Sequence, residues 1–141
     1  MLAGASLRLL GASMVGVRLP QALPAVPRAR PLVCVAPRLP PHLEEMLEQL
    51  ESGEAQLFDV REEDEAAAGK LAAAELVPLS QLQQGTPPPM PLSRDKLTYV
   101  HCAAGVRVHY AAPILQLMGF ERVVPLQEGF ATLRALGLPE E

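Results

Sequence analysis

The chain has few cysteines. Only Cys34 and Cys102 occur among its 141 residues, with no Cys-x-x-Cys motif and no cysteine–histidine pairing at the spacing of metal ligands. This scarcity argues against a disulfide framework and against a structural zinc site, so we expect no bound metal. The sequence also lacks an apolar run long enough to cross a bilayer, and we therefore expect no membrane span.

Acidic residues are absent from the start of the chain. The first is Glu44, whereas five of the 12 basic residues precede it. The part from Glu44 onward holds the other seven basic residues and all 16 acidic ones, a net charge of about −9. We therefore expect the two parts of the chain to have different functions.

Residues 1–38 have the composition of a targeting segment. They are rich in Ala, Leu, Gly and Pro and carry arginine as their only charged side chain, which is typical of a transit peptide. Arg8 and Arg18 interrupt the only apolar stretch that a secretory signal could use. Residues 32–36 resemble the end of many plastid leaders, so we expect a plastid (chloroplast) location, with the mitochondrion as the alternative. A disordered leader, or an edge strand at 32–36, is the other interpretation.

Residues 39–139 are long enough for one domain with a core, and they alternate between helical and strand patterns. Apolar residues at helical spacing from Leu43 to Leu50 predict a first helix, with proline before its first turn and Gly53 at its end. Pro113 lies inside a later helical pattern and predicts a kink. The remaining predictions are strands at 56–60, 97–101 and within 119–126, helices starting near 61 and 108, and an extended surface connection at 83–91.

Cys102 marks the stretch on which the rest of the chain depends. The strand pattern of residues 97–101 ends at this cysteine, small residues follow, and an amphipathic helix pattern begins. The sulfur therefore lies where loop N–H groups and the positive end of a helix converge, which favours the thiolate. A lone cysteine after a buried strand is usually an inert apolar residue, but this setting makes Cys102 a candidate nucleophile.

The residues after Cys102 are candidates for anion binding. Small side chains let the main chain fold around the sulfur, and we expect an anion cradle from the backbone of Ala103, Ala104, Gly105, Val106 and Arg107. The Arg107 guanidinium can also hold the loop or attract an anionic donor. His101 and His109 are predicted to be non-catalytic, because strand alternation directs His101 away from the Cys102 face and the helix exposes His109.

Four motifs, in order along the chain, resemble those of single-domain rhodaneses, the sulfurtransferases that carry sulfur as a cysteine persulfide. Cys102 and Arg107 form a Cys-x4-Arg loop, which is one residue shorter than the phosphate-sized Cys-x5-Arg loop of dual-specificity phosphatases. The other motifs are Asp59-Val60-Arg61-Glu62 followed by Glu65, the stretch 69–80, and Gly129-Phe130. The resemblance covers about residues 39–139, with Lys70, Val108 and Glu128 replacing the family's usual histidine, serine and glycine.

The resemblance implies a three-layer α/β fold with a central, mainly parallel sheet of about five strands flanked by helices. It implies a sulfurtransferase in which Cys102 takes a sulfane sulfur from thiosulfate or a persulfide, holds it as a persulfide and passes it to a thiol or cyanide. The implied partners are a small anionic sulfur donor and a thiol acceptor such as thioredoxin or glutathione. No metal or organic cofactor is required.

Two charged groups precede the Cys102 stretch. Asp59 and Arg61 are expected to form a supporting ion pair at the carboxyl end of a strand, an edge that lines the ligand crevice in α/β sheets. The acidic residues 62–65 are expected to be a solvated helix start, and their charge gives no reason to expect nucleic acid.

Two other functions stay open at this point. One is a catalytically weak scaffold or persulfide-sensing module, in which the Cys102 loop is present but turnover is negligible. The other is a small-anion reductase or phosphatase, which the length of the loop disfavours.

Overall fold

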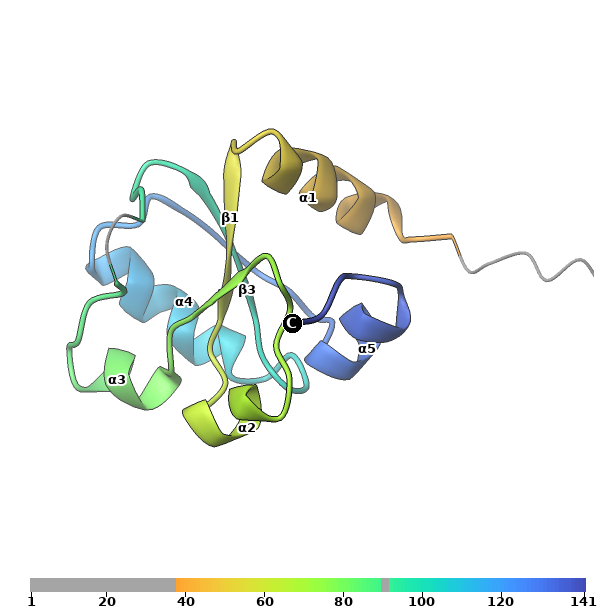
Figure 1. The fold of residues 1–141 in the computed structure, drawn as a ribbon. Helices are drawn as coiled ribbons and strands as arrows, with labels where there is room; N and C mark the ends of the chain where they lie inside the picture. Colours follow the sequence, from red (N-terminus) through yellow and green to blue (C-terminus); the bar gives the residue numbers. More distant parts are fainter. Residues whose placement is uncertain (1–37, 90–91) are drawn as a thin grey trace, which may run out of the picture. The chain divides into compact units, whose positions relative to one another are not determined.

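The computed structural model describes residues 38–89 and 92–141. The transit-peptide prediction and the alternative strand at 32–36 therefore lie outside the described residues, apart from Arg38 itself. Helices and strands alternate along the described chain (Figure 1). Their bounds are α1 (Pro41–Glu51), β1 (Ala55–Asp59), α2 (Glu63–Ala67), β2 (Ala74–Leu76), α3 (Leu79–Gln83), β3 (Leu97–His101), α4 (Val108–Leu117), β4 (Arg122–Pro125) and α5 (Phe130–Ala135).

The strands form one parallel sheet in the order β2-β1-β3-β4, with Asp59 of β1 opposite His101 of β3. The predicted α/β fold with a mainly parallel sheet is confirmed. The expected count of about five strands is too high for the described residues, which form four. The remaining candidate at 32–36 lies outside them, and near the C-terminus Leu71 and Glu140 form only an isolated antiparallel bridge.

Helices cover both faces of the sheet and give the three layers that the resemblance implies (Figure 1). On one face α3 and α4 pack over an apolar cluster that includes Phe58, Val100 and Leu115. On the other face α1 and α5 pack over a cluster that includes Leu57 and Tyr99. Successive residues of β1 and β3 thus contribute alternately to the two faces, as the strand period of two requires.

All strands end at the same edge of the sheet because they are parallel. This edge lies at the bottom of Figure 1, with α2 and the loop between β3 and α4. The N–H of Val60 donates a hydrogen bond of 3.0 Å to the carbonyl of His101, so the ends of β1 and β3 stay joined. The edge therefore brings residues 59–65 next to the segment that begins at Cys102.

The predicted helix ends largely agree with the structure. The predicted first helix is present as α1; it begins at Pro41, so this proline is its first residue, and Ser52 is its C-cap before Gly53. α4 contains the exposed Pro113 and continues to Leu117, so the proline does not end the helix. The five-residue helix α3 was not predicted; it begins directly after Pro78 and is too short to show a helical period.

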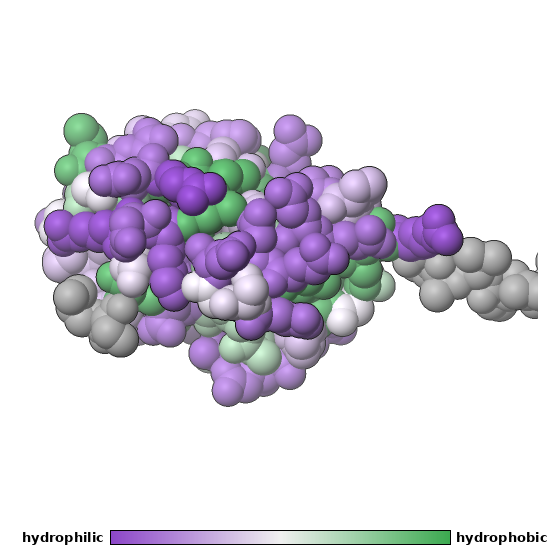
Figure 2. Space-filling model, turned by 90° about the horizontal axis from the view of Figure 1, so that it is seen from above, coloured by the Kyte–Doolittle hydropathy of each residue, from purple (hydrophilic) through white to green (hydrophobic). Residues whose placement is uncertain are grey.

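The opposite edge, where the strands begin, is mainly hydrophilic at its surface, with hydrophobic residues in small groups between polar ones (Figure 2). No helix in residues 38–89 or 92–141 combines the length and the apolar character that crossing a membrane would require.

Candidate active site

Cys102 directly follows β3, at the edge where the strands end. It is a free cysteine, is 1% exposed, and packs in the apolar cluster with Phe58, Val100 and Val108. The predicted order of strand, loop and helix is present, since α4 begins at Val108. The thiol therefore lies beneath the surface, where water is largely excluded.

The loop after Cys102 packs closely against the segment that joins β4 to α5. A Cβ atom on Gly105 would lie 2.1 Å from the carbonyl oxygen of Gln127. A Cβ atom on Gly129 would lie 2.0 Å from the carbonyl oxygen of Ala103. Gly105 also has φ 73°, in the left-handed region that favours glycine. Two backbone segments thus approach each other here at a distance that no side chain permits.

Backbone donors are concentrated in this loop. In the described part of the chain, the six N–H groups of residues 103–108 donate to no backbone carbonyl and to no side-chain oxygen or nitrogen. The last of them begins α4, where the positive end of the helix dipole adds to the local potential. Such donors can stabilise a bound anion. Their predicted role as a cradle for a sulfur anion stays a prediction.

Asp59 and Arg61 form the predicted ion pair, and this prediction is confirmed. The Arg61 guanidinium donates to the Asp59 carboxylate from Nε, at 2.9 Å and 3.1 Å, and from Nη2, at 2.7 Å. The Arg61 backbone N–H donates to the same carboxylate at 3.0 Å. The arginine and aspartate side chains are only 5% and 0% exposed. This pair is therefore part of the interior.

Arg61 connects the ion pair to the Cys102 loop. Its Nη2 also donates to the carbonyl of Gly69 at 2.8 Å, and its guanidinium carbon lies 3.9 Å from the ring centroid of Phe130. The N–H of Phe130 in turn donates to the carbonyl of Cys102 at 2.8 Å. We call Asp59, Arg61, Phe130 and the adjoining His101 the buried network. It supports the loop from inside the protein.

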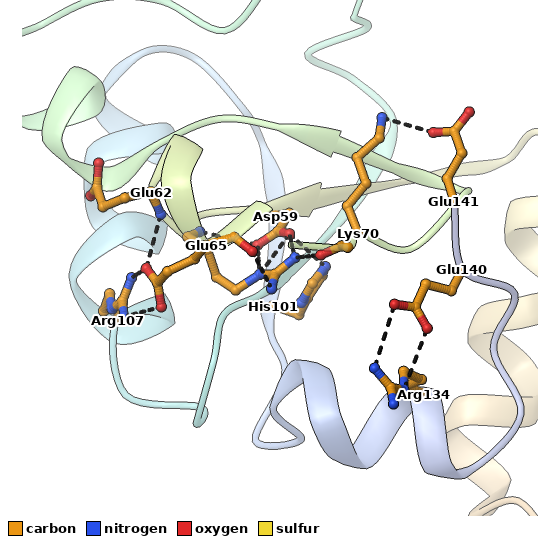
Figure 3. Close-up of polar contacts among 11 residues, drawn as sticks. Asp59, Glu62, Glu65, Lys70, His101, Arg107, Arg134, Glu140 and Glu141 are labelled. Carbon is orange, nitrogen blue, oxygen red and sulfur yellow. Dashed lines mark hydrogen bonds and ion pairs between the residues drawn. The ribbon is translucent and has the colours of Figure 1, made fainter. Parts of the chain in front are cut away.

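His101 is fully buried, and its Nε2 lies 3.8 Å from Oδ2 of Asp59 (Figure 3). Neither ring nitrogen has a hydrogen-bond partner among the residues that the structure describes. Burial lowers the pKa of His101 from its usual value of 6.5, although the Asp59 charge acts in the opposite direction. His101 adjoins Asp59 and not the cluster that holds Cys102, as strand alternation predicts. His109 is exposed, also as predicted.

Arg107 and Glu65 form a second ion pair, which joins the loop to α2 (Figure 3). Nη2 of Arg107 donates to Oε1 of Glu65 at 2.8 Å, and Nη1 donates to Oε2. The arginine and glutamate side chains are part-buried, at 33% and 31% exposed, and because they keep contact with solvent, unlike Arg61 and Asp59, we call them the exposed pair. Chiefly through the hydrogen bonds from Arg107, the pKa of Glu65 is lowered from 4.5 to about 2.

The prediction that residues 62–65 form a solvated helix start is wrong for two of them. The Glu65 carboxylate accepts a hydrogen bond from the N–H of Glu62 at 3.1 Å, besides those from Arg107. The Glu62 carboxylate accepts from the N–H of Ser80 at 3.3 Å and from its hydroxyl at 2.7 Å. Ser80 and Arg107 lie 18 and 42 residues away from their partners. The three-residue spacing of Glu62 and Glu65, which is similar to a capping box, was the only local feature of the sequence that indicated hydrogen bonds to these carboxylates.

The site thus offers one buried thiol, a row of backbone donors and two arginine–carboxylate pairs. Nowhere in the described ranges do three or more His, Cys, Asp or Glu side chains gather to hold a metal ion. The groups present suit nucleophilic chemistry at sulfur, with negative charge held by N–H donors.

Comparison of the sequence with known proteins identifies a family. The sequence profile described as the Rhodanese-like domain matches residues 42–135, about two thirds of the chain. A protein of Bacillus subtilis (strain 168), named uncharacterized protein YqhL, is 38% identical over 76 residues. That match covers 54% of this chain and 58% of the Bacillus protein, so the chain spans less than two thirds of this curated relative.

Solved structures show the same fold. The rhodanese-related protein of Thermoplasma volcanium is 28% identical, with a TM-score of 0.56 over 70% of this chain and 92% of its own. The Alr3790 protein of Anabaena sp. is 27% identical, with a TM-score of 0.59 over 70% and 77%. The human single-domain sulfurtransferase TSTD1, at 24% identity, a TM-score of 0.56 and coverage of 65% and 91%, is similar in fold alone. With the family profile and the shared fold, the chain belongs to the rhodanese-like domain family.

Proposed function

We propose that the chain is a sulfurtransferase, which moves a sulfane sulfur from thiosulfate or a persulfide to a thiol or cyanide through a persulfide on Cys102. The Cys102 thiolate attacks the outer sulfur of the donor, and the bond between that sulfur and the rest of the donor breaks. Thiosulfate then leaves as sulfite, which takes the bonding electron pair. The persulfide next gives its outer sulfur to a thiolate or to cyanide, forming a new persulfide or thiocyanate, and Cys102 is again a thiolate.

One observation carries this proposal: six consecutive N–H groups without a protein acceptor directly follow the cysteine and lead into α4. A persulfide anion carries its charge on the outer sulfur, and unpaired N–H donors at a helix start stabilise such a charge. Burial of Cys102 makes these interactions stronger than they would be in water, because the local dielectric constant is lower. The sulfurtransferase function named for the human structural neighbour is consistent with this proposal.

Mass spectrometry of the full chain tests the proposal. We expect incubation with thiosulfate, followed by removal of the donor, to increase the intact mass by one sulfur atom. Cys34 and Cys102 are the only cysteines, so matched variants assign the sulfur. Cys34→Ser should gain the sulfur and Cys102→Ser should not. A gain that survives in Cys102→Ser and disappears in Cys34→Ser would overturn the assignment.

A persulfide-sensing or scaffolding role is the second candidate, and the 1% exposure of Cys102 favours it. A sensor would take up sulfur but release it slowly, because an acceptor could not reach the buried persulfide. Addition of cyanide to the loaded chain distinguishes the two functions. Repeated formation of thiocyanate supports the enzyme, whereas a single uptake without release supports the sensor.

We also infer that residues 1–38 direct the chain to a plastid, with the mitochondrion as the alternative. The support is compositional: this segment has no acidic residue, and arginine is its only charged side chain. A fusion of these residues to a fluorescent reporter tests the compartment. Diffuse fluorescence outside both organelles would contradict the inference.

A further inference from the structure

We propose that Glu65 is a specificity-determining residue, which holds the Arg107 guanidinium so that the site takes sulfur from a persulfide, R–S–SH, in preference to dianionic thiosulfate. This inference rests on the proposed function and narrows its donor class. It also assigns a role to a carboxylate that the sequence indicated to be a solvated helix residue.

The exposed pair removes Arg107 as an attractor of anions. Both terminal nitrogens of its guanidinium face the Glu65 carboxylate, one at 2.8 Å. Glu65 is held in turn by the N–H of Glu62 at 3.1 Å, so its position is defined by two elements of the fold. A paired guanidinium contributes little net charge to its surroundings. A dianion approaching the loop therefore does not meet a free cation at Arg107.

The other charged side chains that the structure describes near the Cys102 loop also give no free cation for the second negative charge of a dianionic donor. Arg61 is buried and faces Asp59, so its charge is also neutralised. Glu62 is the N-cap of α2 and the first three residues of the helix, 63–65, are also acidic; Glu63 and Asp64 are exposed. Residues 59–65 thus carry five carboxylates, of which Asp59 and Glu65 pair with the two arginines at this edge of the sheet. The backbone donors of residues 103–108 can offset the charge of one sulfur anion, and the two arginines at this edge are already paired with carboxylates.

The charge of the reacting groups separates the two donors. Attack of the Cys102 thiolate on thiosulfate brings three negative charges together, and the products are a persulfide anion and a sulfite dianion. Attack on R–S–SH involves only the single negative charge of the thiolate. The S–S bond breaks, R–S⁻ leaves with the electron pair, and Cys102–S–SH keeps the proton. A site without a free cation therefore favours the persulfide.

The apolar side chains next to Arg107 fit an organic donor. Val106 is 61% exposed and Tyr110 is 62% exposed. Val106 lies in the loop and Tyr110 in the first turn of α4, so these exposed side chains come from the segment on either side of Arg107. Thiosulfate has no apolar part that could use them. The R group of a persulfide does.

Single-turnover loading of the full chain tests the proposal, with thiosulfate and cysteine persulfide as the two donors and intact mass as the readout. In the wild type, cysteine persulfide should load Cys102 faster. Glu65→Gln frees Arg107 and should raise the thiosulfate rate about tenfold relative to the cysteine persulfide rate. Asp64→Asn removes the same charge from the same helix without touching Arg107, and should change this ratio less than about twofold.

An unchanged donor ratio in Glu65→Gln, or an equal change in Asp64→Asn, would overturn the proposal and leave the sulfurtransferase function intact. If neither donor loads wild-type Cys102, the proposed function itself fails. If Glu65→Gln does not fold, the loading rates of the wild type with the two donors, and their dependence on ionic strength, still test the proposal. Raising the ionic strength from about 0.01 M to about 0.15 M should speed thiosulfate loading by screening repulsion, whereas slower loading would reveal attraction by a free cation and overturn the proposal.

Discussion

The two arginine–carboxylate pairs beside the Cys102 loop use the same chemistry in different surroundings. Arg61 and Asp59 are 5% and 0% exposed, and the guanidinium also contacts the Phe130 ring. Arg107 and Glu65 are each about one third exposed, at 33% and 31%. Both pairs have at least two hydrogen bonds between guanidinium and carboxylate, so geometry does not distinguish them.

The surroundings decide what each pair does. Removing one partner of a buried pair leaves an unpaired charge in the interior, which costs about 3–5 kcal/mol, so Asp59 and Arg61 act as structure. An exposed pair contributes only about 0–1 kcal/mol, because water and ions screen it. Glu65 can therefore change with little loss of stability. We propose that its main effect is to neutralise Arg107 beside the Cys102 loop, and this makes it suitable for setting specificity.

The largest expected effect comes from breaking the buried network. Asp59→Asn keeps the shape of the side chain but leaves the Arg61 charge buried without its partner, and should lower the free energy of unfolding by about 3–5 kcal/mol. Urea denaturation measures the loss. Glu140→Gln is the control, because Glu140 pairs with Arg134, which is 58% exposed. A loss below about 1 kcal/mol in Asp59→Asn would mean that the two kinds of pair do not differ.

A second experiment tests whether the close backbone contact between Gly105 and Gln127 contributes to stability as much as the buried network does. Gly105→Ala should cost about 3 kcal/mol, because the new Cβ meets the Gln127 carbonyl and φ is unfavourable. Gly53→Ala is a matched control: its φ of 76° is close to the 73° of Gly105, but no atom lies within 4 Å of the added Cβ. It should cost only about 1 kcal/mol. Equal losses in urea denaturation would show that conformation alone, and not close packing, requires Gly105.

The third experiment tests the buried network through the pH dependence of stability. The pKa of His101 in the folded protein lies below its ordinary value of 6.5 because of burial. Below pH 6.5 the unfolded chain binds the proton more readily, so stability should fall as the pH is lowered through 6.5 towards the folded pKa. The slope is at most about 1.4 kcal/mol per pH unit. Urea denaturation of wild type and His101→Leu at several pH values measures it, and the slope should be smaller in the variant. Identical slopes would contradict the expectation.

The smallest expected effect is that of the exposed pair on stability. Because the folded pKa of Glu65, about 2, lies below the unfolded value of 4.5, the pair stabilises the fold above pH 4.5 and this contribution is lost as the pH falls from 4.5 to about 2. Glu65→Gln should lower stability near neutral pH by about 0–1 kcal/mol and reduce the acid slope. Denaturation of wild type, Glu65→Gln and Asp64→Asn across this range measures both effects. A loss above about 3 kcal/mol in Glu65→Gln would place the exposed pair with the buried one.

Local patterns predicted much of the fold. The expected elements are present at three places: the helix that follows the prolines at the start of α1, the strands predicted at 56–60 and 97–101, and the loop of small residues after Cys102. The ion pair of Asp59 and Arg61 was also predictable, because its partners are two residues apart. The short helix α3 was not predicted, since five residues after a proline show no period from which a helix can be inferred.

The contacts that surround the site could not be predicted in the same way. Glu65 accepts hydrogen bonds from Arg107, which lies 42 residues later in the chain. The N–H of Phe130, which follows β4, donates to the carbonyl of Cys102. Acidic residues at a helix start are usually solvated, and nothing next to Glu65 in the chain indicates its partner. Only the parallel packing of β1, β3 and β4 brings these segments to one edge.

The order of the elements, the position of Cys102 between a strand and a helix, and the buried charge pair could all be predicted from the amino-acid order, because they depend on neighbours within a few residues. The tertiary structure alone decided which charges near Cys102 are neutralised, how deeply the sulfur is buried and why Gly105 and Gly129 have no room for a side chain. These properties depend on distances between segments that are remote in the chain. The physical reason is that electrostatic and steric energies follow separation in space, which a one-dimensional pattern does not contain.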